Sequence, residues 1–333
     1  MLLELDGISV EYETPDGPLR AVDDVSFTLD DGETLGIVGE SGCGKTTVAK
    51  SILKILADNG DIVAGEVRFQ DENIVPLSEP EFRAYRWSDI AYIIQNAMNA
   101  LDPVHRIGNQ IVEVIRAHSD ASKSEAKERT NELLERVGLD TGRARDYPHE
   151  LSGGQKQRAV IALALALNPT LIVADEITTG LDVIVQNEVL DLINEIQTDL
   201  GSAMIFVSHD INVIQEVADR VAVMYGGRLM ELGKTGDVFQ GGAHPYTLGL
   251  RHAFPSLERN QELVSIPGQP PNLVDPPLGC RFRERCPFAT EECEIPPEIH
   301  SIGDRHGIKC HYPERMEEFQ KQSRNPKVWE DNQ

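Results

Sequence analysis

The chain has 333 residues, of which 40% are hydrophobic and 26% are charged, enough for about two domains at roughly 150 residues each. This composition excludes collagen-like, intrinsically disordered and disulfide-dependent miniprotein classes. The 55 acidic and 31 basic residues give a net charge of −24. A surface of that sign repels phosphate backbones, so we do not expect general nucleic-acid binding.

Neither a membrane span nor a signal peptide is expected. A span needs roughly 18–20 apolar residues, and the longest apolar run, residues 159–167, is much shorter. Met1 is followed by Leu2, Leu3, Glu4, Leu5 and Asp6, without the basic residues of a signal peptide. We therefore expect a cytosolic chain with reduced cysteines, and clustered cysteines are predicted to bind metal rather than form disulfides.

Strand and helix signals alternate along the first two thirds of the chain. The expected strands are residues 2–12, 25–29, 34–38, 66–69, 90–94, 171–173 and 204–207, and the expected helices lie within 46–56, 107–138 and 183–200. This alternation predicts an α/β fold with a largely parallel sheet covered by helices. The helical block from residue 107 to about 166 is interpreted as an insertion.

The composition changes near Gly233. Proline and glycine become frequent there, the periodicity is lost, and four of the five cysteines follow. We predict a small, loop-rich unit stabilised by something other than a hydrophobic core. The charged tail after Met316 is expected to be solvated.

A phosphate-binding loop is predicted between a strand and a helix, in the pattern GxxxxGK[ST]. Its residues are Gly39, Glu40, Ser41, Gly42, Cys43, Gly44, Lys45 and Thr46, followed by Thr47. The glycines let backbone N–H groups surround a phosphate at the start of a helix. Lys45 is expected to reach the β- and γ-phosphates, and the Thr46 hydroxyl to bind Mg²⁺.

A second part of the site is predicted where an apolar strand ends in two acids, Asp175 and Glu176. The carboxyl ends of parallel strands meet at one sheet edge. Asp175 is expected to hold Mg²⁺ through water, and Glu176 to act as general base on the attacking water.

The segment from Leu151 to Gln155, LSGGQ, resembles the signature motif of ABC-transporter ATPases. This resemblance implies a P-loop NTPase (RecA-like) core with a β-subdomain and an inserted helical subdomain, and a head-to-tail dimer. The residues expected to contact ATP across that dimer are Ser152, Gly153, Gly154, Gln155 and the D-loop residue Asp182. In the same resemblance Gln95 is the Q-loop ligand of Mg²⁺, His209 is the switch histidine and Tyr12 stacks on adenine. One departure is Ile177 after Glu176, where the family usually has proline; we expect it to relax the turn that aims Glu176.

Several segments resemble the peptide/nickel importer branch of this family. They are residues 147–150, 181–186, 244–247 and 267–271, together with the cysteine region from residue 279. The resemblance implies an ABC ATPase domain at 1–235, with its helical subdomain at about 96–166, and a C-terminal extension at 236–333. The ATPase would pair with a sister subunit or with itself, at the cytoplasmic face of the membrane. It would drive two permeases fed by an extracellular solute-binding protein.

Four cysteines in the extension are predicted to hold a metal centre. They are Cys280, Cys286, Cys293 and Cys310, separated by 5, 6 and 16 residues. Structural zinc sites favour closer pairs, and the resemblance implies a [4Fe–4S] cluster, which we favour over Zn²⁺. Three histidines nearby, His300, His306 and His311, are interpreted as surface residues.

The expected function is ATP hydrolysis that energises import of short peptides. Nickel and sugars remain alternative solutes, because the ATPase does not touch the cargo. A soluble ABC ATPase acting on DNA or ribosomes is disfavoured, because the chain is acidic and has neither a coiled-coil insertion nor a second cassette.

Overall fold

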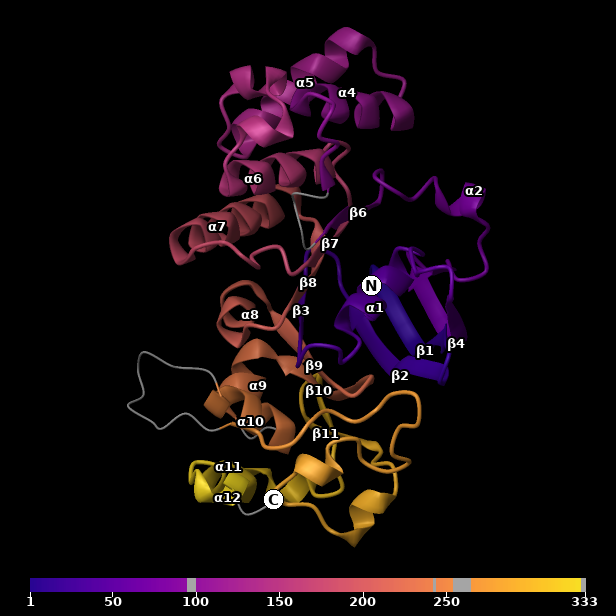
Figure 1. The fold of residues 1–333 in the computed structure, drawn as a ribbon, viewed down its shortest axis with the longest axis vertical. Helices are drawn as coiled ribbons and strands as arrows, with labels where there is room; N and C mark the ends of the chain where they lie inside the picture. The colour runs from indigo at the N-terminus through magenta and orange to yellow at the C-terminus, as the bar shows by residue number, and fades with distance from the viewer. Residues whose placement is uncertain (95–99, 242–243, 254–264, 331–333) are drawn as a thin grey trace. The chain divides into compact units, whose positions relative to one another are not determined.

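The computed structural model describes residues 1–94, 100–241, 244–253 and 265–330 (Figure 1). The chain forms two compact units. The first contains residues 1–2, 29–34 and 76–207, and the second contains residues 3–28, 35–75 and 208–333. Within the described ranges, none of the helices is both long and apolar enough to cross a membrane.

The first unit is built on three parallel strands, β6 (Ile90–Ile93), β7 (Leu171–Asp175) and β8 (Ala203–Ser208). Every residue of β7 and β8 is buried, as expected for apolar runs that are covered on both faces. The predicted strands at these positions are confirmed. The helices of this unit are α2 (Glu79–Phe82), α4 (Ile107–His118), α5 (Lys123–Arg136), α6 (Gly153–Ala164) and α7 (Val183–Leu200), with short 3₁₀ turns η1 (Thr141–Arg145) and η2 (Pro148–Glu150).

Local capping explains where these helices begin and end. The helical pattern predicted over residues 107–138 is divided in two, because Ser122 and Glu125 form a capping box that starts α5. The predicted helix over residues 183–200 is confirmed as α7. Asp182 caps its first turn, and Gly201 ends it in a left-handed conformation (φ 63°).

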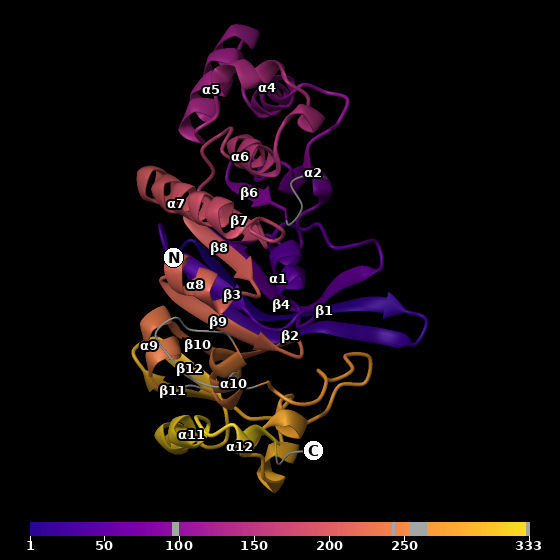
Figure 2. The same ribbon diagram turned by 60° about the vertical axis from the view of Figure 1, so that its left-hand side comes forward.

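The second unit contains two sheets. The first has the strand order β2 (Gly17–Leu29), β1 (Leu3–Thr14), β4 (Gly60–Phe69), β5 (Glu72–Asn73), and Figure 2 shows β1, β2 and β4 as neighbours. In the second, β3 (Thr34–Val38) runs parallel to β9 (Arg220–Tyr225), and β10 (Arg228–Lys234), β12 (His306–Lys309) and β11 (Ile299–Gly303) follow in antiparallel order. The helices are α1 (Lys45–Ile52), α8 (Ile211–Val217), α9 (Thr235–Gln240), α10 (Pro245–Ala253), α11 (Met316–Gln322) and α12 (Lys327–Glu330), with 3₁₀ turns η3 (Arg283–Arg285), η4 (Glu291–Glu294) and η5 (Pro313–Arg315).

Helix α1 is shorter than the sequence predicted. It ends at Ile52 rather than at residue 56. Leu53 donates its N–H to the carbonyl of Ala49, and Lys54 then adopts a positive φ of 51°, a conformation that no α-helix can continue.

The C-terminal part is more regular than its composition suggested. The buried carboxylate of Glu231 on β10 accepts hydrogen bonds from the N–H of His244 (2.8 Å) and the hydroxyl of Thr247 (2.6 Å). It also lies 2.8 Å from Nε2 of His306 on β12. One carboxylate therefore joins α10 and β12 to β10, so the part after Gly233 contains regular helices and strands in addition to the predicted loops.

The prediction of a solvated tail after Met316 is wrong. Phe319 stacks on Phe288 with a centroid distance of 4.2 Å, and Trp329 is only 1% exposed. The Trp329 indole N–H donates to the carbonyl of Ser323 (3.0 Å). The ring packs against α10 at Gly249, where an added Cβ would lie 2.8 Å from it. A few large apolar residues among many charges were enough to dock α11 and α12 near α10 (Figure 1).

We expect Trp329→Ala to undock this tail, because removing a fully buried aromatic side chain costs about 3–5 kcal/mol. Hydrogen exchange of the amides of α11 and α12 measures the effect, and their protection should fall strongly. Lys327→Ala, at an exposed position of the same short helix, should change the docking free energy by less than about 0.5 kcal/mol. Equal protection in both variants would contradict this packing role of Trp329.

Candidate functional site

The predicted phosphate loop connects β3 to α1 in the second unit. Two of its glycines are required by close backbone contacts. A Cβ on Gly39 would lie 2.1 Å from the carbonyl oxygen of Met224, and one on Gly44 would lie 2.4 Å from that of Ala21. Thr46 and Thr47 fall in the first turn of α1, while Ser41 and Gly42 are exposed at the turn of the loop.

Lys45 occupies the centre of this loop. Its side chain is buried, and Nζ donates to the carbonyls of Gly39 (2.8 Å) and Glu40 (3.0 Å). The loop thus carries a fixed cation, which suits it to a phosphate. Burial raises the pKa of the Cys43 thiol against the opposing effect of Lys45, so Cys43 is a small, neutral loop residue.

Two other residues predicted for the ATP site lie in this unit. Tyr12 on β1 pairs with Gly60 on β4, and a Cβ at Gly60 would lie 2.4 Å from the Tyr12 ring. The ring therefore lies over a position that has no side chain and remains half-buried. His209 directly follows β8 and is exposed.

The acid pair lies in the first unit, at the end of β7. Asp175 is 1% exposed and accepts a hydrogen bond from the Tyr92 hydroxyl (3.1 Å). Burial and the Asp175 charge raise the pKa of Tyr92, which keeps its hydroxyl a donor. Sequence reasoning missed Tyr92; its only signal was a tyrosine within a short predicted strand.

Glu176 starts a closed turn. Its backbone has a positive φ of 49°, and its N–H donates to the carbonyl of Val207 (2.9 Å). Thr179 donates its N–H to the Glu176 carbonyl (3.1 Å) and its hydroxyl to the Glu176 carboxylate (3.3 Å). Thr179 thus closes this turn, and the Ile177 side chain is buried; that Ile177 relaxes the turn relative to proline stays a prediction.

The LSGGQ segment forms the start of α6. Ser152 and Gln155 make a capping box, with Gln155 N–H donating to Ser152 Oγ (3.3 Å) and Ser152 N–H to Gln155 Oε1 (3.0 Å). Ser152 and Gly153 are exposed. Asp182 is exposed as well and caps α7 by accepting from the N–H groups of Ile184 and Val185, both at 3.1 Å.

The predicted residues are thus divided between the units. Tyr12, the loop at 39–47 and His209 belong to the second unit, and the acid pair, the LSGGQ segment and Asp182 belong to the first. Gln95 lies outside the described residues.

The cysteines of the C-terminal part line one small cavity of about 20 Å³. Its other walls are mostly aromatic or apolar, among them Phe282, Phe288 and Phe319. Burial raises the pKa of Cys280 to about 11, that of Cys310 to about 12, and that of Cys286 as well. Within the residues that the structure describes, no group of three or more His, Cys, Asp or Glu side chains is arranged to hold a metal ion.

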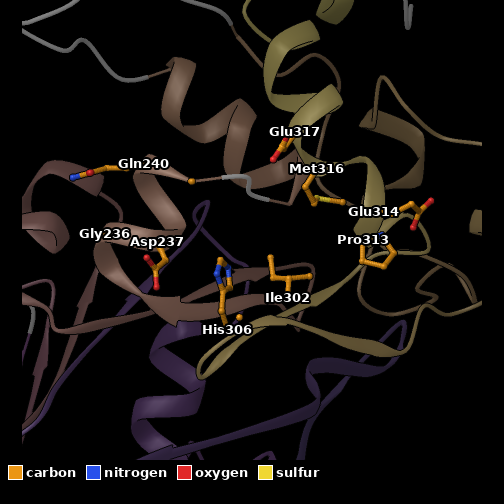
Figure 3. Close-up of a pocket in the computed structure, with 11 residues that line it drawn as sticks. Gly236, Asp237, Gln240, Ile302, His306, Pro313, Glu314, Met316 and Glu317 are labelled. Carbon is orange, nitrogen blue, oxygen red and sulfur yellow. The ribbon is translucent and has the colours of Figure 1, made fainter.

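A separate cavity of about 820 Å³ lies between α9, β12 and α11, with acidic side chains around it (Figure 3). His306 lines it and is only 7% exposed because of its contact with Glu231. The interpretation of His306 as a surface residue is therefore wrong. His300 and His311 are half-buried, and His311 donates to the carbonyl of Ile295 (2.9 Å).

Comparison with known proteins identifies two family segments. A family described as ABC transporter matches residues 22–179, which contain the phosphate loop, the LSGGQ segment and the acid pair. A second, described as oligopeptide/dipeptide transporter, C-terminal region, matches residues 230–293.

Relatives that align with most of the chain are also ATP-binding proteins of oligopeptide transport. The oligopeptide transport ATP-binding protein OppD of Salmonella typhimurium is 43% identical over 316 residues, covering 94% of this chain and 94% of that protein. OppD of Bacillus subtilis is 43% identical, covering 92% of this chain and 88% of that protein. Among solved structures, the ATP-binding cassette MJ0796, a dimer in a post-hydrolysis state bound to ADP and Pi, has a TM-score of 0.64 and 27% identity. It covers 70% of this chain and 99% of the cassette. The chain therefore belongs to the family of ABC transporter ATP-binding subunits, which are ATPases.

Proposed function

We propose that this chain is the ATP-hydrolysing subunit of an importer of short peptides. The observation that carries the proposal is the C-terminal match to oligopeptide and dipeptide transporters at residues 230–293. The relatives named for oligopeptide transport cover more than nine tenths of the chain, which supports the same solute class. Nickel and sugars are the alternative solutes.

In this proposal the phosphate loop holds the β- and γ-phosphates of ATP. Lys45, already held inside the loop by two carbonyls, exchanges these contacts for phosphate oxygens. Backbone N–H groups from Gly39 to Thr47 surround the phosphates, and Tyr12 stacks on adenine.

Mg²⁺ would be held by Thr46, Gln95 and Asp175, where it would neutralise phosphate charge. Hydroxyl and carboxylate oxygens are the ligands that Mg²⁺ prefers, and the Tyr92 hydrogen bond fixes the Asp175 carboxylate.

Glu176 takes a proton from the attacking water, whose oxygen bonds to the γ-phosphorus as the bond to the β–γ bridging oxygen breaks. ADP and phosphate leave, and His209 contacts the γ-phosphate during this step.

The signature residues Ser152, Gly153, Gly154 and Gln155 and the D-loop residue Asp182 would act on ATP held by a second ATPase subunit, identical or different. Two observations support such a partner. Ser152 and Gly153 are exposed at the N-terminus of α6, the end of a helix that favours an anion. Val183 and Ile184, beside Asp182, are 72% and 73% exposed. Exposed apolar side chains at the start of a helix suit a covered surface.

The subunit would act at the cytoplasmic face of the membrane, beneath two permease subunits that receive solute from an extracellular binding protein. The permeases would dock near residues 96–103, of which 96–99 lie outside the described residues. ATP binding and release would shift the dimer between closed and open states by binding them with different affinity.

We further propose that the four cysteines hold a [4Fe–4S] cluster, with Zn²⁺ as the alternative. The donor type supports this proposal, because the four cysteine thiols line one cavity, although their arrangement in the described residues is not that of a metal site. When bound, the cluster would cross-link segments that lack an extensive core.

Glu176→Gln should lower ATP turnover by about 10²–10⁴-fold, the usual contribution of a general base, while MgATP binding is retained. The closed dimer should then accumulate with ATP, which size-exclusion chromatography detects. Glu195→Gln, an exposed glutamate on α7, is the matched control and should hydrolyse ATP at the parent rate. Parent-rate hydrolysis by Glu176→Gln would mean that another residue is the base.

Uptake of a labelled dipeptide and a labelled pentapeptide tests the solute class. In cells whose only copy carries Glu176→Gln, both should fall to background while uptake of an unrelated amino acid is normal. If both peptides still enter and no redundant system is present, peptide import is ruled out, and nickel and sugars are tested next.

Metal analysis tests the cysteine site. Full-length chain purified without oxygen should contain iron and sulfide and absorb broadly in visible light, and Cys286→Ser should lose all three signals. Cys43→Ser, at the one cysteine outside this cavity, should keep them. Zinc in place of iron would favour the alternative, and a chain without either metal would refute the site.

A further inference from the structure

The strongest unexplained contact joins the cysteine segment to the phosphate loop. Arg285, in the 3₁₀ turn η3, makes a two-pronged ion pair with the carboxylate of Glu40, with N–O distances of 2.7 and 2.9 Å. The Arg285 side chain is 7% exposed and that of Glu40 is 24% exposed. Paired hydrogen bonds with little solvent access are the strong form of such an interaction.

Arg285 is held in place independently of Glu40. Its Nε donates to the carbonyl of Pro267 (2.7 Å), Nη1 to the Tyr225 hydroxyl (3.1 Å) and Nη2 to the carbonyl of Ile266 (3.3 Å). The guanidinium also lies 5.5 Å from the centre of the Tyr225 ring. Because these contacts hold the Arg285 side chain without any contribution from Glu40, Arg285 is a preorganised partner for the Glu40 carboxylate.

The backbone of Glu40 is tied to the same region. Its N–H donates to the Tyr246 hydroxyl (2.9 Å), and its carbonyl accepts from Lys45 Nζ (3.0 Å). Tyr246 packs on Tyr225 and Phe282, with centroid distances of 4.6 and 5.2 Å. The C-terminal part thus binds both the main chain and the side chain of Glu40.

The negative charge of Glu40 makes these contacts important for nucleotide binding. Its carboxylate belongs to a loop whose ligand carries several negative charges, and like charges at short range in a partly buried site repel strongly. Arg285 cancels that charge and holds the carboxylate on the side of the C-terminal part. Without Arg285, an unpaired carboxylate would remain beside the phosphates.

We propose that Arg285 is a positioning residue for the nucleotide, supplied by the cysteine segment and acting through Glu40 to set the affinity of the phosphate loop for MgATP. The proposal rests on the assignment of residues 39–47 as the ATP-binding loop. It adds a residue outside the ABC ATPase motifs to the determinants of ATP binding.

Calorimetric titration of the purified full-length chain with MgATP tests the proposal. We expect Arg285→Gln to weaken MgATP binding by about 10–100-fold, because the Glu40 carboxylate would then be unpaired and would repel the phosphates. Arg285→Lys keeps the charge without the two-pronged bond and should weaken binding less. The matched control is Arg283→Gln on the same turn, whose exposed partner is Glu294 at 2.7 Å; its affinity should stay within about twofold of the parent.

A rescue separates charge cancellation from simple support of the fold. The double variant Glu40→Gln with Arg285→Gln removes both charges, so its MgATP affinity should return to within a few-fold of the parent. In the assembled transporter, Arg285→Gln should raise KM for ATP and leave kcat nearly unchanged, because the hydrolytic residues are intact.

Two results would overturn the proposal: parent affinity in Arg285→Gln, or weak binding that the double variant does not recover. If Arg285→Gln does not fold, Arg285→Met, which keeps the apolar stem and removes the charge, takes its place, and parent affinity in that variant would overturn the proposal. A parent chain that fails to bind MgATP would instead refute the nucleotide-site assignment, so the two failures are distinguishable.

Discussion

A single buried carboxylate organises the part of the chain on which the phosphate loop depends. Glu231 satisfies its oxygens with His244, Thr247 and His306. A carboxylate without such partners would be costly to bury, so α10 and β12 are held at fixed places on β10. Tyr246 lies between His244 and Thr247 in the sequence, so these contacts also place its hydroxyl where it accepts the N–H of Glu40 in the phosphate loop.

The phosphate loop consequently has two layers of support. The inner layer is local: glycines permit close approach to Met224 and Ala21, and Lys45 fills the centre. The outer layer comes from residues far along the chain, through Tyr246 and Arg285. This outer layer is significant because the chain has a net charge of −24, which repels a polyphosphate. An arginine that pairs with a carboxylate of the loop reduces this repulsion locally.

The sequence was sufficient where the signal is local. Buried parallel strands appear as apolar runs, caps such as Ser122 and Asp182 mark helix starts, and the glycine loop lies between strand and helix as predicted. Contacts between distant residues carry no such signal. Tyr92 bonds to Asp175 across 83 positions, and nothing in the sequence near either residue indicates the pair. The tail was missed for another reason: Phe319 and Trp329 are too widely spaced to form a pattern, although each is fully buried.

The pairing of Glu40 with Arg285 has a consequence for biosynthesis. The two residues are 245 positions apart, so the glutamate emerges from the ribosome long before its partner exists. During that interval the loop carries its negative charge uncompensated. The loop therefore acquires its outer support only after residue 285 has been translated.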